Sequence, residues 1–351
     1  MATPAGAPPF PWADPAALER HVLTFGAGIG ADEVEALALS RFVAAAWESA
    51  PEEAHGGWGR RSAATPGVLR LSRHSRLIGP YALEPGDAVQ LGVPASAVSA
   101  YLVDAPRERG EAPYPGGDRD GIKRAFPDAT PVRDEERVVR WLVSAARRVG
   151  GAVRIAGSGA VLVPDPQASI DLTVFTDVWL EPQAALAVLQ RVAPQARLAM
   201  GAVPWAGPPP GTGEDDAPGT TDLPARVRRN LHAEADAYDV AALSRPDELD
   251  GYGALVDLGI DGLIAVEAGG EQALPLALAG LPWAAGGAVT YRVLWAAPDF
   301  LELELERPSL AHRVARSRAQ PLVSALAREL HRAVGGEVLD AAEFLINPAD
   351  L

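Results

Sequence analysis

The chain has 351 residues, of which 48% are hydrophobic and 22% charged, so it can bury a core and is long enough for two compact domains. Its 31 basic and 46 acidic residues give a formal net charge of −15, which disfavours broad binding to a nucleic-acid backbone. The absence of cysteine excludes disulfides, thiolate catalysis and cysteine-bound metals, and is compatible with a reducing compartment.

An N-terminal extension is expected over 1–96. Its first 14 residues are rich in proline and alanine, which predicts disorder, and they lack the basic and apolar stretches of a signal peptide. Asp32 and Glu35 form a capping-box pattern before a run of apolar residues at helical spacing, which predicts a helix over 32–49. The other elements expected in the extension are short strands over 68–72 and 88–93.

A regular order of elements follows over 97–204. Hydrophobic periodicity predicts a strand, a helix, two strands, a helix and a strand, which is the βαββαβ order of a ferredoxin-like unit. Such a unit is an antiparallel sheet with both helices on one face. The six elements are expected at 98–103, 135–149, 153–163, 170–178, 182–192 and 196–203.

A linker is expected over 205–250. Residues 207–222 contain four acids and many prolines and glycines but no apolar period, which predicts a mobile acidic segment. Residues 223–232 contain several arginines and predict a short basic helix.

The same order of six elements returns over 251–351. Leu301, Leu303 and Leu305 alternate with glutamates, a pattern that predicts a strand with one buried face. The predicted fold class is therefore α+β, with two ferredoxin-like units after the N-terminal extension. The elements of the second unit are expected at 260–267, 271–279, 289–296, 300–306, 319–334 and 338–346.

A short sequence echo supports a repeated architecture. Val149-Gly150-Gly151 ends one predicted helix and Val334-Gly335-Gly336 ends another, and each is followed by a short strand. The echo follows the first helix of one predicted unit but the second helix of the other, so the two units do not superpose in a simple frame.

Nucleotide-binding and covalent-catalysis motifs give no support for an enzyme. Residues 26–31 fit the G-x-G-x-x-G/A pattern, but the next parallel strand that a dinucleotide site needs is missing from 49–56, so a glycine turn before a helix is the preferred interpretation. The single lysine, Lys123, is followed by Arg124, which excludes a P-loop. In its polar surroundings this lysine also lacks the desolvation that a Schiff-base residue needs.

Metal and cofactor sites are not indicated either. The six histidines are dispersed without the spacing of a helical or strand metal site. Asp118 and Asp120 form a D-x-D step, which is more typical of a solvated turn than of a cation site. We therefore expect no cofactor and no metal.

Arginine clustering is the best functional lead in the sequence. An arginine guanidinium matches carboxylate and phosphate oxygens in two-point geometry, so a local cluster in an acidic chain indicates a site for an anionic group. Pairing with the chain's own acids is the alternative interpretation. The candidate binding residues are Arg60, Arg61, Arg70, Arg73, His74 and Arg76.

Two classes of function remain open. The first is a non-enzymatic binding or regulatory protein that recognises a protein partner or a small anionic ligand. The second is a cofactor-free enzyme that uses Asp, Glu and His for acid–base chemistry in a groove between the domains, with Asp257, Asp261 and Glu267 as acidic candidates. No nucleic-acid partner is expected, because the chain is acidic. No membrane partner is expected either, because the longest uncharged stretch is broken by prolines. A cytoplasmic location is predicted.

Overall fold

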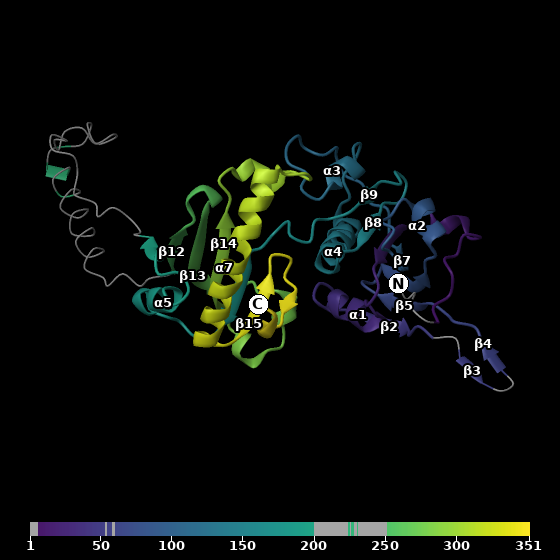
Figure 1. Ribbon diagram of the computed structural model, residues 1–351, viewed down its shortest axis with the longest axis horizontal. Coiled ribbons are helices and arrows are strands. Elements are labelled where there is room, and N and C mark those ends of the chain that lie inside the picture. The colour runs from purple at the N-terminus through teal and green to yellow at the C-terminus, as the bar shows by residue number, and fades with distance from the viewer. Residues whose placement is uncertain are drawn as a thin grey trace.

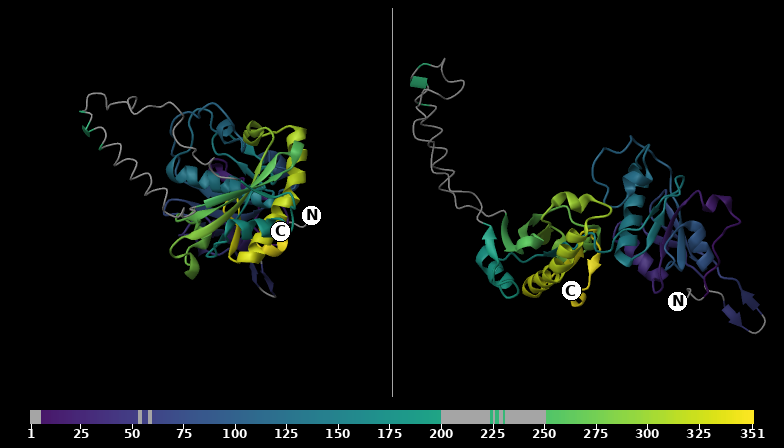
Figure 2. Two further views of the ribbon diagram at one scale, coloured as in Figure 1. Left: turned by 90° about the vertical axis from the view of Figure 1, so that its left-hand side faces the viewer. Right: turned by 45° about the horizontal axis from the view of Figure 1, so that its top comes forward.

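The computed structural model describes residues 6–52, 55–57, 60–199, 224, 226–227, 230 and 251–351. It is an α+β structure in which two halves lie side by side, each built on one antiparallel sheet of seven strands (Figures 1 and 2). The linker over 205–250 and the basic helix over 223–232 lie largely outside the described residues.

The first sheet has the strand order β2-β5-β6-β7-β1-β8-β9, and every neighbouring pair is antiparallel. Its strands are β1 (His21–Phe25), β2 (Ala46–Ser49), β5 (Gly67–Arg70), β6 (Arg76–Ala82), β7 (Ser99–Asp104), β8 (Ala152–Arg154) and β9 (Val161–Leu162). The helices of this half are α1 (Ala31–Leu39), α2 (Pro85–Leu91), α3 (Ile122–Ala125) and α4 (Arg133–Val149). A separate two-stranded hairpin is formed by β3 (His55–Gly57) and β4 (Arg60–Ser62).

The second sheet has the strand order β11-β12-β13-β14-β10-β15-β16 and is likewise antiparallel throughout. Its strands are β10 (Leu172–Thr176), β11 (Arg197–Ala199), β12 (Gly251–Asp257), β13 (Leu263–Glu271), β14 (Ala288–Ala296), β15 (Glu337–Asp340) and β16 (Leu345–Ile346). The α-helices described in this half are α5 (Pro182–Leu189) and α7 (Leu310–Val334), and its 3₁₀ turns are η2 (Gly259–Asp261), η3 (Leu276–Leu278), η4 (Pro282–Ala284), η5 (Phe300–Glu304) and η6 (Pro348–Asp350).

The two halves have the same topology. In each, the first strand leads through a helix to an edge strand, this edge strand begins a meander of four strands that runs back across the sheet, and a long helix then leads to a final hairpin on the other side of the first strand. Four strands of the main sheet therefore separate the two main helices of each half, where βαββαβ has two. The ferredoxin-like repeat is not confirmed, and the first sheet takes strands from both the expected extension 1–96 and the expected unit 97–204.

The two Val-Gly-Gly steps occupy equivalent positions in the two halves. Gly150-Gly151 follows α4 and Gly335-Gly336 follows α7, so both pairs join the long helix of a half to its last hairpin. A Cβ atom added at Gly151 would collide with the backbone carbonyl of Thr24 in β1. One added at Gly336 would collide with the carbonyl of Phe175 in β10, so both turns require a residue without a side chain.

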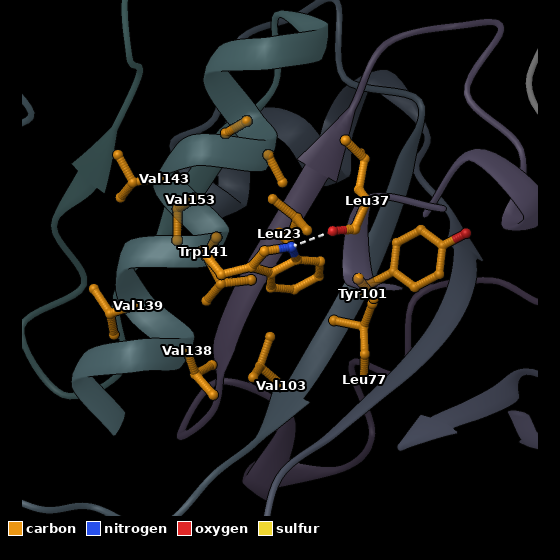
Figure 3. Close-up of a cluster of buried hydrophobic side chains, with 14 of the residues drawn as sticks. Leu23, Leu37, Leu77, Tyr101, Val103, Val138, Val139, Trp141, Val143 and Val153 are labelled. Carbon is orange, nitrogen blue, oxygen red and sulfur yellow. Dashed lines mark hydrogen bonds between the residues drawn. The ribbon is translucent and has the colours of Figure 1, made fainter. Parts of the chain in front are cut away.

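The first core lies between the sheet and the helices α1 and α4. The indole of Trp141 on α4 is buried in it, and its Nε1 donates a hydrogen bond of 2.9 Å to the carbonyl oxygen of Leu37 at the end of α1 (Figure 3). Tyr101 of β7 is buried in the same cluster. The equivalent position in β14 holds the buried Tyr291, because Tyr101 pairs with Leu23 of β1 and Tyr291 pairs with Val174 of β10.

The opposite face of each sheet is covered by the connection between its third and fourth meander strands. In the first half this connection contains α2, whose Ala88 and Leu91 pack with Phe10 of the N-terminal segment. In the second half it contains η3 and η4, and Leu278 of η3 packs against Phe175. The repeat therefore extends to three layers in both halves.

The two halves share part of one core. Phe344, from the connection between β15 and β16, is only 2% exposed and belongs to the hydrophobic cluster of the first half. Beside it, Arg41 pairs with Glu343 at 2.5 Å. Arg148 at the end of α4 lies 3.7 Å from Asp340 at the end of β15, so the helical face of the first half lies against the last hairpin of the second.

The expected strand over 300–306 is wrong. Its first five residues form the 3₁₀ turn η5, in which Asp299 accepts a hydrogen bond from the backbone N–H of Leu301. Phe300 is 71% exposed. The preceding strand β14 is already paired on both sides, with β13 and β10, so this alternating segment has no free strand beside it.

Other expectations are corrected by the same kind of tertiary context. The helix expected over 32–49 ends at Leu39, and 46–49 form β2, which pairs with β5. The strand expected over 88–93 is largely the helix α2, which Pro85 begins. The helix expected over 271–279 is reduced to the short 3₁₀ turn η3.

Candidate functional site

The predicted arginine cluster is divided by the fold. Arg60 and Arg61 belong to β4, in the small hairpin outside the two large sheets. Arg70 and Arg76 are a cross-strand pair of β5 and β6. Arg73 lies in the turn between these strands, so the six candidates do not form one surface.

Arg70 and Arg76 have partners outside the cluster. Arg70 donates a hydrogen bond of 3.1 Å to the carbonyl oxygen of Ala44. Arg76 pairs with Glu48 at 2.9 Å, and this hydrogen bond raises the pKa of the guanidinium. The alternative interpretation, pairing with the chain's own acids, therefore applies to Arg76.

Arg73 and His74 instead line a pocket of about 700 Å³ at the N-terminal end of α4. Three further arginines line it, one from the connection after α1 and two from the first turns of α4. We call this pocket the arginine pocket. Its charged and titratable lining residues are Arg41, Arg73, His74, Glu108, Arg133, Asp134 and Arg137.

Asp134 holds the pocket together. Its carboxylate accepts hydrogen bonds from the hydroxyls of Ser72 at 2.8 Å and Ser75 at 2.5 Å, which fixes the β5–β6 turn against the start of α4. Arg137 donates to the other carboxylate oxygen at 2.7 Å. Burial opposes ionisation, but these three hydrogen bonds outweigh it and lower the pKa of Asp134.

The arginines are only partly neutralised. The lining contains four arginines and two carboxylates, a formal charge of +2 with His74 neutral, and a third carboxylate, Glu343, pairs with Arg41 from outside the lining. Arg133 has a largely exposed side chain, and its Nη1 lies 3.6 Å from Glu108. The guanidinium of Arg73 donates to Nε2 of His74 at 2.7 Å, and among the described residues no carboxylate pairs with it. The pocket can therefore offer guanidinium donors to an anion.

Arg133 also has an unusual backbone. Its φ of 55° places it in the left-handed region, which costs a residue with a side chain about 1–2 kcal/mol. Among the described residues the other non-glycine position of this kind is Glu343, at φ 63°, which pairs with Arg41. Arg133 therefore lines the arginine pocket and Glu343 contacts one of its arginines, and strained backbone often accompanies functional sites.

A buried carboxylate lies behind the pocket wall. Glu135 has no exposed surface, accepts a hydrogen bond of 2.7 Å from the backbone N–H of Glu108 and pairs with Arg109. His21 approaches it at 3.3 Å through Nε2, while its Nδ1 accepts from the N–H of Ala156, so the hydrogen is on Nε2. Burial opposes ionisation, but the hydrogen bonds from His21, Arg109 and Glu108 lower the pKa of Glu135.

A smaller pocket, of about 270 Å³, lies between the two halves. Asp171 and Arg147 are among its lining residues, and burial raises the pKa of the Asp171 carboxyl, which accepts a hydrogen bond of 2.8 Å from the backbone N–H of Trp295. The acids expected in an inter-domain groove do not line it, because Asp257, Asp261 and Glu267 belong to β12, η2 and β13.

The remaining motifs have structural roles. The glycine-rich turn over 26–31 joins β1 to α1, but both neighbours of β1 are antiparallel, unlike the parallel strands of a dinucleotide fold. Asp118 accepts from the backbone N–H groups of Lys123 and Arg124, at 2.9 and 2.8 Å. Within the described residues, no group of three or more His, Asp and Glu side chains is arranged to hold a metal ion.

Comparison of the chain with protein-family models, curated proteins and solved structures finds no match. No helix in the described part of the chain is both long and apolar enough to cross a bilayer.

Proposed function

We propose that the protein is a non-enzymatic binding protein and that its ligand is a small anion held in the arginine pocket. The observation that carries the proposal is the convergence of Arg41, Arg73, Arg133 and Arg137, from three segments of the chain, on one pocket of about 700 Å³. This volume is within the range of small-molecule sites, and guanidinium groups bind carboxylate and phosphate oxygens in two-point geometry.

The surroundings of the pocket favour an anion further. The first turn of α4 contributes the positive end of the helix dipole. Both lining carboxylates already accept hydrogen bonds, Asp134 from Ser72, Ser75 and Arg137, and Glu108 from the backbone N–H of Asp134 at 3.2 Å. In an acidic chain the local positive field would also steer an anion to this point.

Calorimetric titration of the full chain with inorganic phosphate and with succinate tests this proposal. We expect binding that weakens with added salt, because the interaction is electrostatic. Arg73→Ala and Arg133→Ala should each lower the affinity about tenfold, because each removes a charged donor.

Arg140→Ala is the matched control. Arg140 is on the same helix, pairs with Glu136 and does not line the pocket, so its removal changes net charge equally. Equal binding of both anions to the Arg73→Ala and wild-type proteins, or binding by neither protein, would contradict the proposal.

The alternative function is a cofactor-free enzyme that acts in the pocket between the halves. Asp171 favours it, because a carboxyl with a raised pKa beside a polar pocket is a typical general acid or base. Turnover of a substrate that is lost in Asp171→Asn but retained in Arg73→Ala would select this alternative. For either function we propose a reducing cytoplasm as the compartment, on the basis of the cysteine-free sequence.

A further inference from the structure

The second half has a pocket at the place equivalent to the arginine pocket. Both are bounded by the N-terminal end of the long helix, by the turn between the second and third meander strands and by the segment after the fourth. In the second half these are α7, the β12–β13 turn with η2, and the segment that contains η5. This second pocket has a volume of about 640 Å³.

The long helix differs between the halves at this place. α7 has 25 residues and α4 has 17, and both end at the same Val-Gly-Gly step, so α7 begins eight residues earlier. The additional turns bring Leu310, His312 and Val314 to the pocket. Arg318, which lies at the position of Arg133, pairs with Asp261 at 3.4 Å.

The chemistry of the second pocket is opposite to that of the first. Three carboxylates, Asp261, Asp299 and Glu302, and one arginine, Arg318, line it, a formal charge of −2 with His312 neutral. The imidazole of His312 packs against the indole of Trp295. Burial lowers the pKa of His312, which favours the uncharged ring.

Exposed apolar side chains surround this second pocket. Leu310 is 68% exposed and Ile260 is 85% exposed, and both line it. Phe300 and Leu301, next to Asp299 along the chain, are exposed on η5. A concentration of exposed apolar groups with a polar rim is typical of a protein interaction site.

We propose that this second pocket is a docking site for a segment of a partner protein that places an apolar side chain in the pocket and presents lysine or arginine to its acidic rim. Charge complementarity with the rim requires a cationic segment. The apolar surface continues beyond the pocket onto η5, which favours a polypeptide over a small molecule. The inference is independent of the anion proposed for the first half.

Fluorescence anisotropy with the full chain tests this inference, using a labelled amphipathic peptide of leucine and lysine as the probe. Leu310→Ser and Ile260→Ser should each weaken binding about tenfold, since each removes an apolar contact at the centre of the site. Both side chains are largely exposed, so the variants should fold. Val89→Ser, which removes an exposed valine on α2 of the other half, should bind like the wild-type chain.

Two further peptides separate charge from apolar contact. A peptide of serine and lysine with the same charge, and one of leucine and glutamate, should both bind at least tenfold more weakly than the leucine and lysine peptide. Equal binding of the probe to Leu310→Ser and wild-type protein would overturn the proposal. So would sedimentation that shows self-association abolished by Leu310→Ser, because the occupant would then be a second copy of the chain. Arg73→Ala should leave peptide binding unchanged.

Discussion

Gly151 and Gly336 occupy the same position in the two halves, each against a backbone carbonyl of the first strand of its sheet in chain order, Thr24 in β1 or Phe175 in β10. The shared close approach, the shared strand order and the buried tyrosines of β7 and β14 describe one architecture built twice. The two pockets at the starts of α4 and α7 therefore occupy equivalent places, and the opposite charge of their linings is a difference between otherwise similar halves.

The glycine positions predict a stability loss. Gly151→Ala and Gly336→Ala should each lower the free energy of unfolding by about 1–3 kcal/mol, because the new methyl group would force the turn away from the strand. Urea denaturation measures the change. Gly86→Ala is the control, since nothing lies within 4 Å of its added Cβ and alanine is favoured within a helix. A neutral Gly336→Ala variant would contradict the close approach.

Glu135 predicts a pH-dependent stability. Its pKa is lower in the folded chain than its unfolded value of about 4.3, so its contribution is present above that pH and is lost as pH falls through the folded pKa. Glu135→Gln should cost about 3 kcal/mol at pH 7, because it leaves Arg109 and His21 without the carboxylate.

Urea denaturation of this variant and the wild-type chain from pH 7 downwards tests the sign. The difference between them should shrink as the medium becomes acidic. Glu136→Gln, at an exposed neighbouring position, should show little difference at any pH. A difference that grows on acidification would mean that Glu135 is not ionised in the folded protein.

Arg133→Gly should separate stability from binding. Glycine adopts the left-handed backbone without the penalty of a side chain, so the melting temperature should be unchanged or higher. Affinity for phosphate should fall, because one guanidinium of the arginine pocket is lost. Arg133→Ala provides the comparison, as it removes the same charge but keeps the strain. A lower melting temperature for the glycine variant would indicate that the backbone is not strained.

Arg76 and Arg73 should differ although both belong to the predicted cluster. Arg76→Ala should leave phosphate affinity within about twofold of the wild type, because Glu48 already neutralises Arg76 and the residue does not line the pocket. The same titration used for Arg73→Ala measures it. Similar losses in the two variants would show that the whole β5–β6 surface, and not the pocket, attracts the anion.

Phe344→Ala should destabilise the first half although the residue belongs to the second. Removing a buried phenylalanine costs about 3–5 kcal/mol, and this one packs in the core that α4 covers. Hydrogen exchange should therefore accelerate in α4. Leu345→Ala, at the exposed neighbouring position, is the control. Protection of α4 that is unchanged by Phe344→Ala would contradict the shared core.

The sequence indicated that an architecture is repeated, but it did not indicate where each repeat begins. The Val-Gly-Gly echo correctly indicated a helix and hairpin built twice, and the long apolar periods of α4 and the end of α7 predicted those helices. The segments 300–306 and 88–93 were misassigned because their local patterns favour strands, while neighbouring strands and Pro85 decide otherwise. The error over 300–306 added a strand to the second predicted unit, whereas 88–93 lay in the expected extension, outside both units.

The candidate site was predictable only in part. Arg73 and His74 are close in sequence to other arginines, which made them visible, but Arg41 and the α4 residues Arg133 and Arg137 are distant in sequence and only the fold brings them to the pocket. One usable signal was missed. Glu135 occupies an apolar position of α4, at helical spacing from buried Val138 and Leu142, and a charge there requires buried partners.

The placement of Phe344 sets an order for folding during synthesis. The first half leaves the ribosome well before Phe344 is translated, so its core stays incomplete on the helical side while the second half is being made. An apolar opening persists there until the β15–β16 connection arrives, and a chaperone that binds exposed apolar surface would meet this chain during that interval.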